Sequence, residues 1–402
     1  MARKMKDSGI EWIGEIPEGW EVHRIKNHFL IISGSGFKPE LQGQSTGDFP
    51  VCKASDISSS GHYLHTSANY ITTDFVKSQH FSIIPKGSIL FAKIGEAMRK
   101  NNRSLCLCDC CVDNNCQGLV PKKISSEFSY YLFTCIDMTW FDNAGTIPCI
   151  NNQKLYDCRF PFPSHDEQLL IANALNLQCT KINEILSHIR SSIEEYKKLK
   201  QAVITQAVTK GVRGEREMKD SEVEWIGKIP AEWCVAKAKY CVTITHGSDP
   251  KTEGSIPVYG SGAESFKTCG EYKEGPTVLI GRKGATLHIP HYIEGKYWNV
   301  DTAFDVKAKN NFSLPYYYYL ATSFDYKFYI SQTTLPGMTQ SNYYNMFLPF
   351  PTFPEQEEIV AYLDAKCVEI DGLITKKAQL VKELENYKKS LIYEVVTGKR
   401  EV

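Results

Sequence analysis

The chain has 402 residues, of which 42% are hydrophobic and 23% charged, and its 46 basic and 46 acidic residues leave no net charge. This length predicts two or three domains with cores of their own, and the composition is that of an ordinary globular protein. Zero net charge excludes a protein that holds nucleic acid by bulk electrostatic attraction alone.

Three further features of the composition concern location. No apolar run reaches the roughly 18 residues that a membrane-spanning helix needs. The first residues, MARKMKDSGIEW, lack the apolar stretch of a secretory signal. The 14 cysteines are too few for a disulfide scaffold and indicate reduced thiols. We therefore expect a cytoplasmic protein.

Two segments of the chain occur twice. A tryptophan motif, MKDSGIEWIGEIPEGWEVHRIK at residues 5–26, returns as MKDSEVEWIGKIPAEWCVAKAK at 218–239, with 13 of 22 positions identical. A second segment, PFPSHDEQ at 161–168, returns as PFPTFPEQ at 349–356. The offsets differ, 213 for the tryptophan motif and 188 for the second segment, so the globules between them differ in length by 25 residues. A repeated scaffold around unlike globules predicts one frame that presents two different reading heads.

Each tryptophan motif carries two tryptophans around an Ile-Pro turn, and these are Trp12 and Trp20 in the first copy and Trp225 and Trp233 in the second. We expect them to pack the globule against the rest of the protein. A base-stacking platform is the alternative, but recognition residues should differ between the copies, whereas these residues repeat.

The first globule, residues 27–160, is predicted to be β-rich, with strands in runs such as Phe81–Ile84 and Ser88–Ile94. A glycine followed by basic residues comes after the second run, which would place cations at an exposed sheet edge. The candidates for DNA contact here are Lys93, Arg99, Lys100 and Arg103. An ordinary solvated turn is the alternative.

The cysteines of LCLCDCCVDNNC (105–116) are irregularly spaced, and the second globule has VDTAF (300–304) where the first has VDNNC (112–116), which argues against a zinc site. Cys106, Cys108 and Cys110 alternate, so we expect them on one strand face as small apolar residues. We predict no metal site.

The end of the first globule, AGTIPCINNQKLYDC (144–158), contains side chains that suit adenine recognition, namely Asn151, Asn152 and Gln153. The same residue types also favour helix caps and turns, which is the alternative.

Residues 166–209 form a predicted helix of about 43 residues, roughly 65 Å long, without Pro or Gly. Apolar or small residues recur at alternating steps of four and three, which is a heptad seam. We assign Ile171, Leu175, Ile182, Ile185 and Ile189 to this seam.

The second globule, residues 240–348, repeats the rhythm of the first with strands in Thr277–Ile280 and Tyr297–Val306. Its candidates for DNA contact are Arg282 and Lys283 after the first of these strands, and Thr339, Gln340, Ser341 and Asn342 near its end. The same alternatives, a solvated turn and cap chemistry, apply to both groups.

A second long helix follows from residue 349, and its seam includes Leu363, Ile370, Ile374, Leu384 and Leu391. A rod of this length needs a partner of equal length, and the chain supplies one. The simplest arrangement pairs the two helices antiparallel within the chain, with an internal pseudo-two-fold repeat. Separate oligomerisation coils are the alternative.

Motifs for catalysis are missing from the sequence. It has no Walker A loop, no H-E-x-x-H and no Asn/Asp-Pro-Pro-Tyr/Phe of amino-methyltransferases. Glu271-Tyr272-Lys273 and Asp325-Tyr326-Lys327 look like fragments of a nuclease D/E-x-K motif, but neither has a convincing upstream Pro-Asp. We therefore expect a non-catalytic protein.

The tryptophan motif M-K-D-S-x-x-E-W-I-G-x-I-P-x-x-W, the phrase TVLIGRKGA…YWNVDTAF, the helix start P-x-P-x-x-x-E-Q and the closing V-T-G-K together resemble the specificity subunit of type I restriction–modification enzymes. The resemblance covers essentially the whole chain. It implies two target-recognition domains that each read one half of a bipartite, asymmetric DNA site. It also implies that two long helices set the half-site spacing and dock two methyltransferase (modification) subunits.

The same resemblance implies restriction subunits that cut and translocate double-stranded DNA, with S-adenosylmethionine, ATP and magnesium bound by the partners and no cofactor in this chain. The expected fold is α+β, with two β-rich recognition domains separated by two long antiparallel coiled-coil helices. The expected boundaries are 1–160 and 218–348 for the recognition domains and 161–217 and 349–402 for the helices with their linker. A self-contained DNA-acting enzyme and a coiled-coil adaptor with β-rich binding heads are the alternatives.

Overall fold

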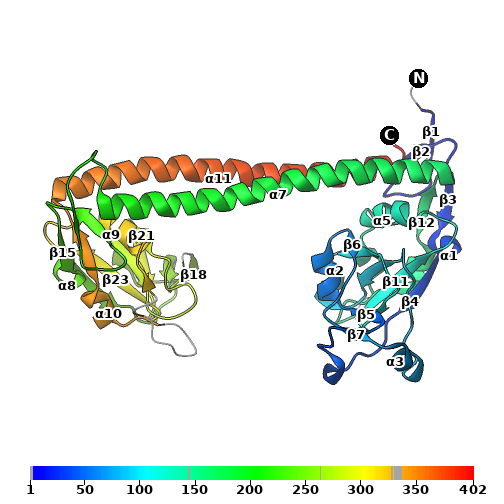
Figure 1. Ribbon diagram of the computed structural model, residues 1–402, viewed down its shortest axis with the longest axis horizontal. Coiled ribbons are helices and arrows are strands. Elements are labelled where there is room, and N and C mark those ends of the chain that lie inside the picture. Colours follow the sequence, from blue (N-terminus) through cyan, green and yellow to red (C-terminus); the bar gives the residue numbers. More distant parts are fainter. Residues whose placement is uncertain (1–2, 144, 263, 327–328, 330–336) are drawn as a thin grey trace. The chain divides into compact units, whose positions relative to one another are not determined.

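The computed structural model describes residues 3–143, 145–262, 264–326, 329 and 337–402. The chain divides into two compact units, of which unit 1 comprises Met1–Ser187 with Val381–Val402 and unit 2 comprises His188–Leu380. Each unit holds one tryptophan motif, one globule and a part of each long helix (Figure 1). None of the described helices is long and apolar enough to cross a lipid bilayer.

Unit 1 is built on a five-stranded sheet of order β4-β11-β8-β9-β6, beside a small sheet of order β10-β5-β7 and two two-stranded ribbons, β1-β2 and β12-β3. Strand β11 runs antiparallel to both β4 and β8. The strands are β1 (Met5–Asp7), β2 (Glu15–Pro17), β3 (Glu21–Arg24), β4 (Phe29–Ser33), β5 (Phe49–Cys52), β6 (Tyr63–Leu64), β7 (Tyr70–Ile71), β8 (Ile89–Ala92), β9 (Arg103–Cys106), β10 (Cys111–Val112), β11 (Cys116–Pro121) and β12 (Arg159–Phe162).

Short helices connect these strands: α1 (Ile25–His28), η1 (Pro39–Leu41), α2 (Ala54–Ser60), α3 (Thr73–Ser78), α4 (Gly95–Arg99), α5 (Ser126–Thr134), η2 (Met138–Phe141) and α6 (Asn152–Asp157). Helix α5 is capped by Ser125, whose side chain accepts a hydrogen bond from the Phe128 amide. Phe128 and Leu132 of α5 share one apolar core with Ile89 of the sheet and Leu175 of the long helix. Helix α5 therefore joins the sheet to the long helix.

Unit 2 repeats the main sheet with four strands, in the order β16-β23-β20-β21. A second sheet has the order β18-β17-β22-β19, and the ribbons β13-β14 and β15-β24 repeat those of unit 1. The strands are β13 (Met218–Asp220), β14 (Lys228–Pro230), β15 (Cys234–Lys237), β16 (Val242–His246), β17 (Ile256–Tyr259), β18 (Ser265–Cys269), β19 (Lys273–Glu274), β20 (Thr277–Gly281), β21 (His291–Ile293), β22 (Lys296–Asn299), β23 (Ala303–Ala308) and β24 (Phe347–Phe350). The short helices are α8 (Ala238–Cys241), α9 (Leu314–Ala321) and α10 (Gln340–Asn345).

The two long helices are α7 (His165–Lys210) and α11 (Phe353–Val396), and each contributes to both units. In unit 1, Lys388 Nζ donates to Asn183 Oδ1 at 2.7 Å. In unit 2, Lys200 Nζ lies 2.6 Å from Asp371 Oδ2. In the same unit, Lys377 Nζ lies 5.5 Å from the centre of the Tyr196 ring, so later residues of α7 contact earlier residues of α11. The helices therefore run antiparallel, which confirms the predicted fold class and the pairing within one chain.

The predicted seam holds along α11, where Leu363, Ile370 and Leu391 are buried and Ile374 and Leu384 are half-buried. Along α7, Ile171, Leu175 and Ile182 are buried and Ile189 is half-buried.

The assignment of Ile185 to this seam is wrong, because its side chain is 48% exposed and Leu186, at 5%, is buried instead. A nearly straight helix has 3.6 residues per turn, so its buried stripe drifts from a strict heptad by about 20° in every seven residues.

Candidate nucleic-acid interface

A glutamate at the start of each long helix fixes the tryptophan motif. In unit 2, Glu355 is 1% exposed and accepts hydrogen bonds from Trp233 Nε1 at 2.9 Å and from Arg216 NH1 at 2.6 Å. The equivalent residues of unit 1 make the same set of contacts, and these are Glu167, Trp20 and Arg3. Trp20 and Trp233 are each 1% exposed, so the predicted packing role is confirmed for them and a stacking platform is excluded.

The glutamine that follows each glutamate fixes the globule. Gln356 accepts from the Ser313 amide at 2.7 Å and donates to the Pro351 carbonyl at 3.0 Å. Gln168 makes the matching bonds at 2.9 and 3.0 Å, to Ser125 and Pro163. Ser125 and Ser313 cap α5 and α9, so these bonds explain why the Glu-Gln pair recurs in P-x-P-x-x-x-E-Q.

A tyrosine on each short terminal helix ties that helix to the sheet. The Ile31 amide donates to Tyr156 Oη at 2.9 Å in unit 1, and the Ile244 amide donates to Tyr344 Oη at 2.8 Å in unit 2. Helices α6 and α10 are thus held in the same place against β4 and β16. The two globules share one frame although their sequences differ.

The frame brings together the two kinds of candidate residue that the sequence predicted separately. After β8, the Ile150 amide donates to the Lys93 carbonyl at 2.9 Å, one residue before Asn151. After β20, the Met338 amide donates to the Arg282 carbonyl at 2.9 Å, one residue before Thr339. In each unit a basic residue that follows the central strand therefore lies beside the start of a short polar helix.

Helix capping, left open by the sequence, occurs at both of these helices. Asn151 Oδ1 accepts from the amides of Gln153 and Lys154 at 2.9 and 3.1 Å. Thr339 Oγ1 accepts from the Asn342 amide at 3.0 Å. Gln153 remains exposed, and its side chain donates to a neighbouring carboxylate of the same helix.

The other predicted amide readers have partners within their own globule. Asn152 accepts from the buried Gln117 at 3.2 Å, and Gln340 donates to the Ile244 carbonyl at 2.7 Å. Asn342 donates to the Tyr329 carbonyl at 2.7 Å, while Ser341 is exposed. These bonds hold α6 and α10 in place.

The prediction that Arg103 contacts DNA is wrong. Its side chain is 5% exposed, and both terminal nitrogens donate to the Ile136 carbonyl, at 3.0 and 3.1 Å. Burial lowers the pKa of Arg103 to about 10. The residue begins strand β9 and points into the core, and its position in a basic run of sequence gave no indication of this.

The remaining predicted cations lie at the surface. Arg99 and Lys100 are exposed at the end of α4, where Arg99 lies 3.5 Å from the carboxylate of Glu96. Lys93 is half-buried, Lys283 is exposed, and Arg282 is ion-paired with Asp301.

The first fragment of a nuclease motif, Glu271-Tyr272-Lys273, does not form a nuclease site. Glu271 accepts hydrogen bonds from Lys251 and Thr252, and the hydroxyl of Thr252 is the main cause that lowers the Glu271 pKa to about 2. Lys273 instead bonds Asn299 at 2.7 Å and lies 3.3 Å from Asp305. Lys327 of the other fragment lies outside the described residues.

The cysteine cluster is part of a core. Cys106 and Cys110 are buried with Cys116, but strand β9 ends at Cys106 and Cys108 is half-exposed in the following bend, so the prediction of one shared strand face is wrong. Burial raises the pKa of the Cys111 thiol to about 11. Over the described residues, no group of three or more His, Cys, Asp or Glu side chains is placed to hold a metal.

Comparison with known proteins decides the family. The family model for the type I restriction modification DNA specificity domain matches residues 17–195 and 235–385. The chain belongs to this family. As a member of it, the chain is a non-catalytic DNA specificity subunit.

Relatives within the family match over different lengths. The putative type I restriction enzyme MjaX specificity subunit of Methanocaldococcus jannaschii is 24% identical over 96% of this chain and 95% of its own. The MjaIX specificity subunit of the same organism is 30% identical over 44% of this chain and 43% of its own.

Among solved structures, a chain from a study of complex assembly and conformational transition of the type I R-M system has a TM-score of 0.72 at 16% identity, covering 96% of this chain and 99% of that one. The HsdS subunit from Thermoanaerobacter tengcongensis has a TM-score of 0.52 at 16% identity, covering 96% and 98%. At these identities the two structures support the specificity-subunit fold.

Proposed function

We propose that each globule of this specificity subunit reads one half of a bipartite, asymmetric DNA site. The observation that carries the proposal is the repeated frame. Glu167 with Gln168 and Glu355 with Gln356 fix two tryptophan motifs and two globules in the same way, although the globules differ in sequence and length. Recognition of two different half-sites requires two different globules, and the repeated frame holds both of them in the same way.

In this proposal, each globule contacts DNA through the surface where a basic residue that follows the central strand lies beside the start of a short polar helix. In unit 1 this surface is formed by Lys93, Arg99, Lys100, Asn151 and Gln153, and in unit 2 by Arg282, Lys283, Thr339 and Ser341. Lysine and arginine suit phosphate oxygens or guanine, and amide and hydroxyl side chains suit adenine edges. A few such cations within each unit are compatible with a chain of zero net charge.

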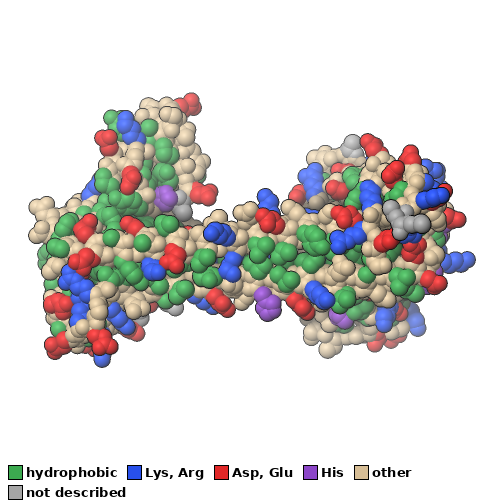
Figure 2. All heavy atoms as spheres, turned by 90° about the horizontal axis from the view of Figure 1, so that it is seen from above, with side chains coloured by type: hydrophobic (Ala, Val, Ile, Leu, Met, Phe, Trp, Pro, Cys, Tyr) green, Lys and Arg blue, Asp and Glu red, His purple; other side chains and the backbone are tan. Residues whose placement is uncertain are grey.

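The long helices dock two methyltransferase subunits in this proposal, and their length sets the distance between half-sites. The helices expose many large apolar side chains: Leu169, Leu170, Leu177, Ile185, Leu199, Phe353, Tyr362, Val368, Leu373, Leu380 and Tyr387. Figure 2 shows hydrophobic side chains along the helices. Exposed apolar surface of this extent is typical of a site of protein association.

The partners supply the chemistry. Restriction subunits join the methyltransferase subunits on double-stranded DNA, and S-adenosylmethionine, ATP and magnesium are bound by those partners. The complex acts in the cytoplasm, where the DNA is.

The proposal is tested by mapping methylated adenines in DNA from cells that express the chain with its methyltransferase subunits. We expect one bipartite sequence with a fixed gap between its halves. Cells that express the methyltransferase subunits alone are the control and should lack this methylation. A single uninterrupted methylated sequence, or the same pattern in the control, would contradict the proposal.

A further inference from the structure

The two globules differ in length at one place in the frame. The segment between β4 and β8, residues 34–88, holds 55 residues, whereas the segment between the equivalent strands β16 and β20, residues 247–276, holds 30. The difference of 25 is the whole difference in length between the globules. We call these segments the first insert and the second insert.

The inserts also differ in structure. The first insert contains three helices and three short strands, which are η1, α2, α3, β5, β6 and β7. The described residues of the second insert contain three strands, which are β17, β18 and β19. The strands that flank the inserts keep the same order in both sheets, β4-β11-β8-β9 and β16-β23-β20-β21. We expect the residues that read the two different half-sites to lie where the two globules differ most.

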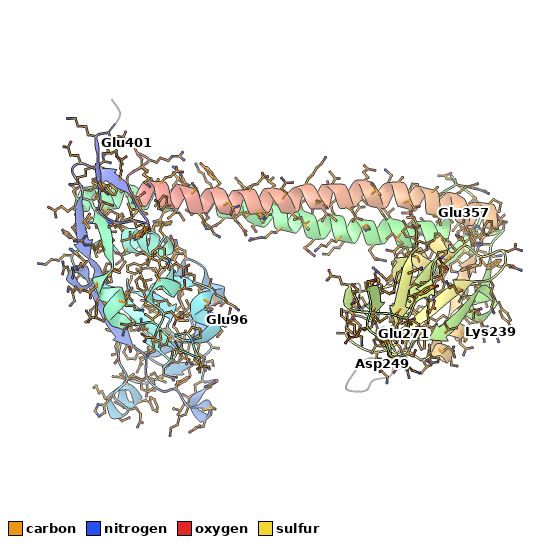
Figure 3. All side chains as sticks on the ribbon, turned by 180° about the vertical axis from the view of Figure 1, so that it is seen from behind. Glu96, Lys239, Asp249, Glu271, Glu357 and Glu401 are labelled. Atoms are coloured by element: carbon orange, nitrogen blue, oxygen red, sulfur yellow. The ribbon has the colours of Figure 1, made fainter. Side chains whose placement is uncertain are left out.

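The second insert is closed at its base. The Glu271 carboxylate accepts from the Lys251 amide at 2.7 Å and from the Thr252 amide and hydroxyl at 3.2 and 2.8 Å. Figure 3 shows Asp249 and Glu271, which lie close to the two ends of this loop, near each other in unit 2. The antiparallel pair β17–β18 therefore leaves the frame and returns to it at the same place.

Strand β18 presents an aromatic side chain and a cation to solvent. It forms the edge of the sheet β18-β17-β22-β19, and its first four residues, Ser265 to Thr268, are exposed. Phe266 is 60% exposed, and Lys267 Nζ lies 5.5 Å from the centre of its ring. Exposed edge strands are normally protected by charge, short length or covering elements. A large exposed phenylalanine on such an edge makes β18 a candidate binding surface.

This edge is continuous with the surface already proposed to contact DNA. Ser261 Oγ, which follows β17, lies 3.3 Å from Thr286 Oγ1 in the loop that begins with Arg282 and Lys283. An added Cβ at Gly260 would lie 3.7 Å from the Phe266 ring, so the ring lies against the same turn. The exposed Lys283 is thus available to a phosphate on DNA that contacts β18.

We propose that the β17–β18 pair enters the major groove of DNA and that Phe266 and Lys267 read bases of the half-site recognised by unit 2. The inference rests on the proposed function. The major groove is wide enough to admit a two-stranded antiparallel ribbon. There, phenylalanine makes apolar contact with the thymine methyl group, and lysine donates to O6 and N7 of guanine. This chemistry favours a half-site that contains thymine and guanine.

The chain offers a matched control in its frame. Tyr240 on α8 is 67% exposed, and Lys239 Nζ lies 4.9 Å from its ring. This pair has the same chemistry as Phe266 and Lys267, but it lies outside the second insert, and Figure 3 shows Lys239 away from Asp249 and Glu271.

The test compares the double variants Phe266→Ala/Lys267→Ala and Tyr240→Ala/Lys239→Ala in the full chain assembled with its methyltransferase subunits. Methylation is mapped on a DNA library randomised in both half-sites, and thermal unfolding of each variant is recorded. The insert variant should lose at least about tenfold of its preference for the cognate bases in one half-site. It should keep the other half-site, the gap and the melting temperature. The control variant should match the wild type in all four.

The outcomes separate the inference from the proposed function. If the wild type methylates no defined bipartite sequence, the proposed function fails. If the wild type does so and the insert variant keeps full preference in both half-sites, only the inference fails. An equal loss in the control variant, or a loss of preference in both half-sites, would also overturn the inference. A change confined to self-association in sedimentation would assign the exposed edge to a second copy of the chain instead.

Discussion

The exposure of two neighbouring isoleucines on α7 gives a sharp test of the helix pair. Ile182 is 7% exposed and belongs to the unit 1 core together with Leu186, Val381 and Leu384, whereas Ile185, one turn further, is 48% exposed. We expect Ile182→Ala to reduce the free energy of unfolding of unit 1 by about 3 kcal/mol, because it removes buried methyl groups and leaves a cavity. Ile185→Ala should change it by less than about 1 kcal/mol.

For a unit of this size, 1 kcal/mol corresponds to roughly 2–4 °C in melting temperature. Differential scanning calorimetry should therefore show a transition lowered by about 6–12 °C for Ile182→Ala and nearly unchanged for Ile185→Ala. Both variants make the same Ile-to-Ala change in the helix propensity of α7, so the comparison isolates burial. Equal shifts for the two variants would refute the assignment of Ile182, and not Ile185, to the buried face of α7 in unit 1.

Three further predictions concern single side chains. Arg103→Met should lower the stability of unit 1 by about 2 kcal/mol in denaturant titration, because it leaves a buried carbonyl without a donor, yet methylation specificity should not change. Glu355→Ala should cost about 3 kcal/mol because it removes the buried carboxylate that pairs Arg216 and Trp233, whereas the exposed Glu358→Ala should cost less than about 1 kcal/mol. The lowered pKa of Glu271, about 2, predicts that its bonds stabilise the second insert fully above the unfolded value of 4.5 and progressively less as the pH falls from 4.5 towards 2. Amide exchange in residues 251–271, corrected for its intrinsic rate, should accelerate in that window, and Glu271→Gln should abolish the pH dependence.

The architecture could be predicted from the sequence because the sequence patterns that indicate it extend over many residues. The repeated tryptophan motifs, the two offsets and the heptad spacing of residues 166–209 each extend over many positions, so a single exception does not obscure them. The detailed burial of α7 could not be predicted in the same way. The choice between Ile185 and Leu186 depends on a drift of about 20° per heptad, which sequence spacing alone does not resolve.

The candidate site was predicted less well because a basic residue in a sequence run carries no information about the direction of its side chain. Arg103 and Lys100 are three positions apart, yet the first is buried beneath Ile136 and the second is exposed. The side-chain amides of Asn152, Gln340 and Asn342 form hydrogen bonds within their own globules.

The second insert could not be recognised from the sequence as a recognition element. Residues 251–271 contain no motif, and the exposure of Phe266 depends on β18 being the edge of its sheet, which is a property of the tertiary structure. The one available signal was the change of offset from 213 to 188, which shows that the globules must differ somewhere between the repeated segments.

The central claim, that one frame carries two independent readers, is tested most directly by exchanging residues 240–348 for the corresponding globule of a related specificity subunit and mapping adenine methylation by the assembled complex. The frame residues Gln356 and Glu355 lie outside the exchanged segment, so they should hold the new globule by the same kind of hydrogen bonds. We predict a bipartite site in which one half is new, while the other half and the gap are those of the wild type. A site in which both halves change, or neither does, would contradict the claim.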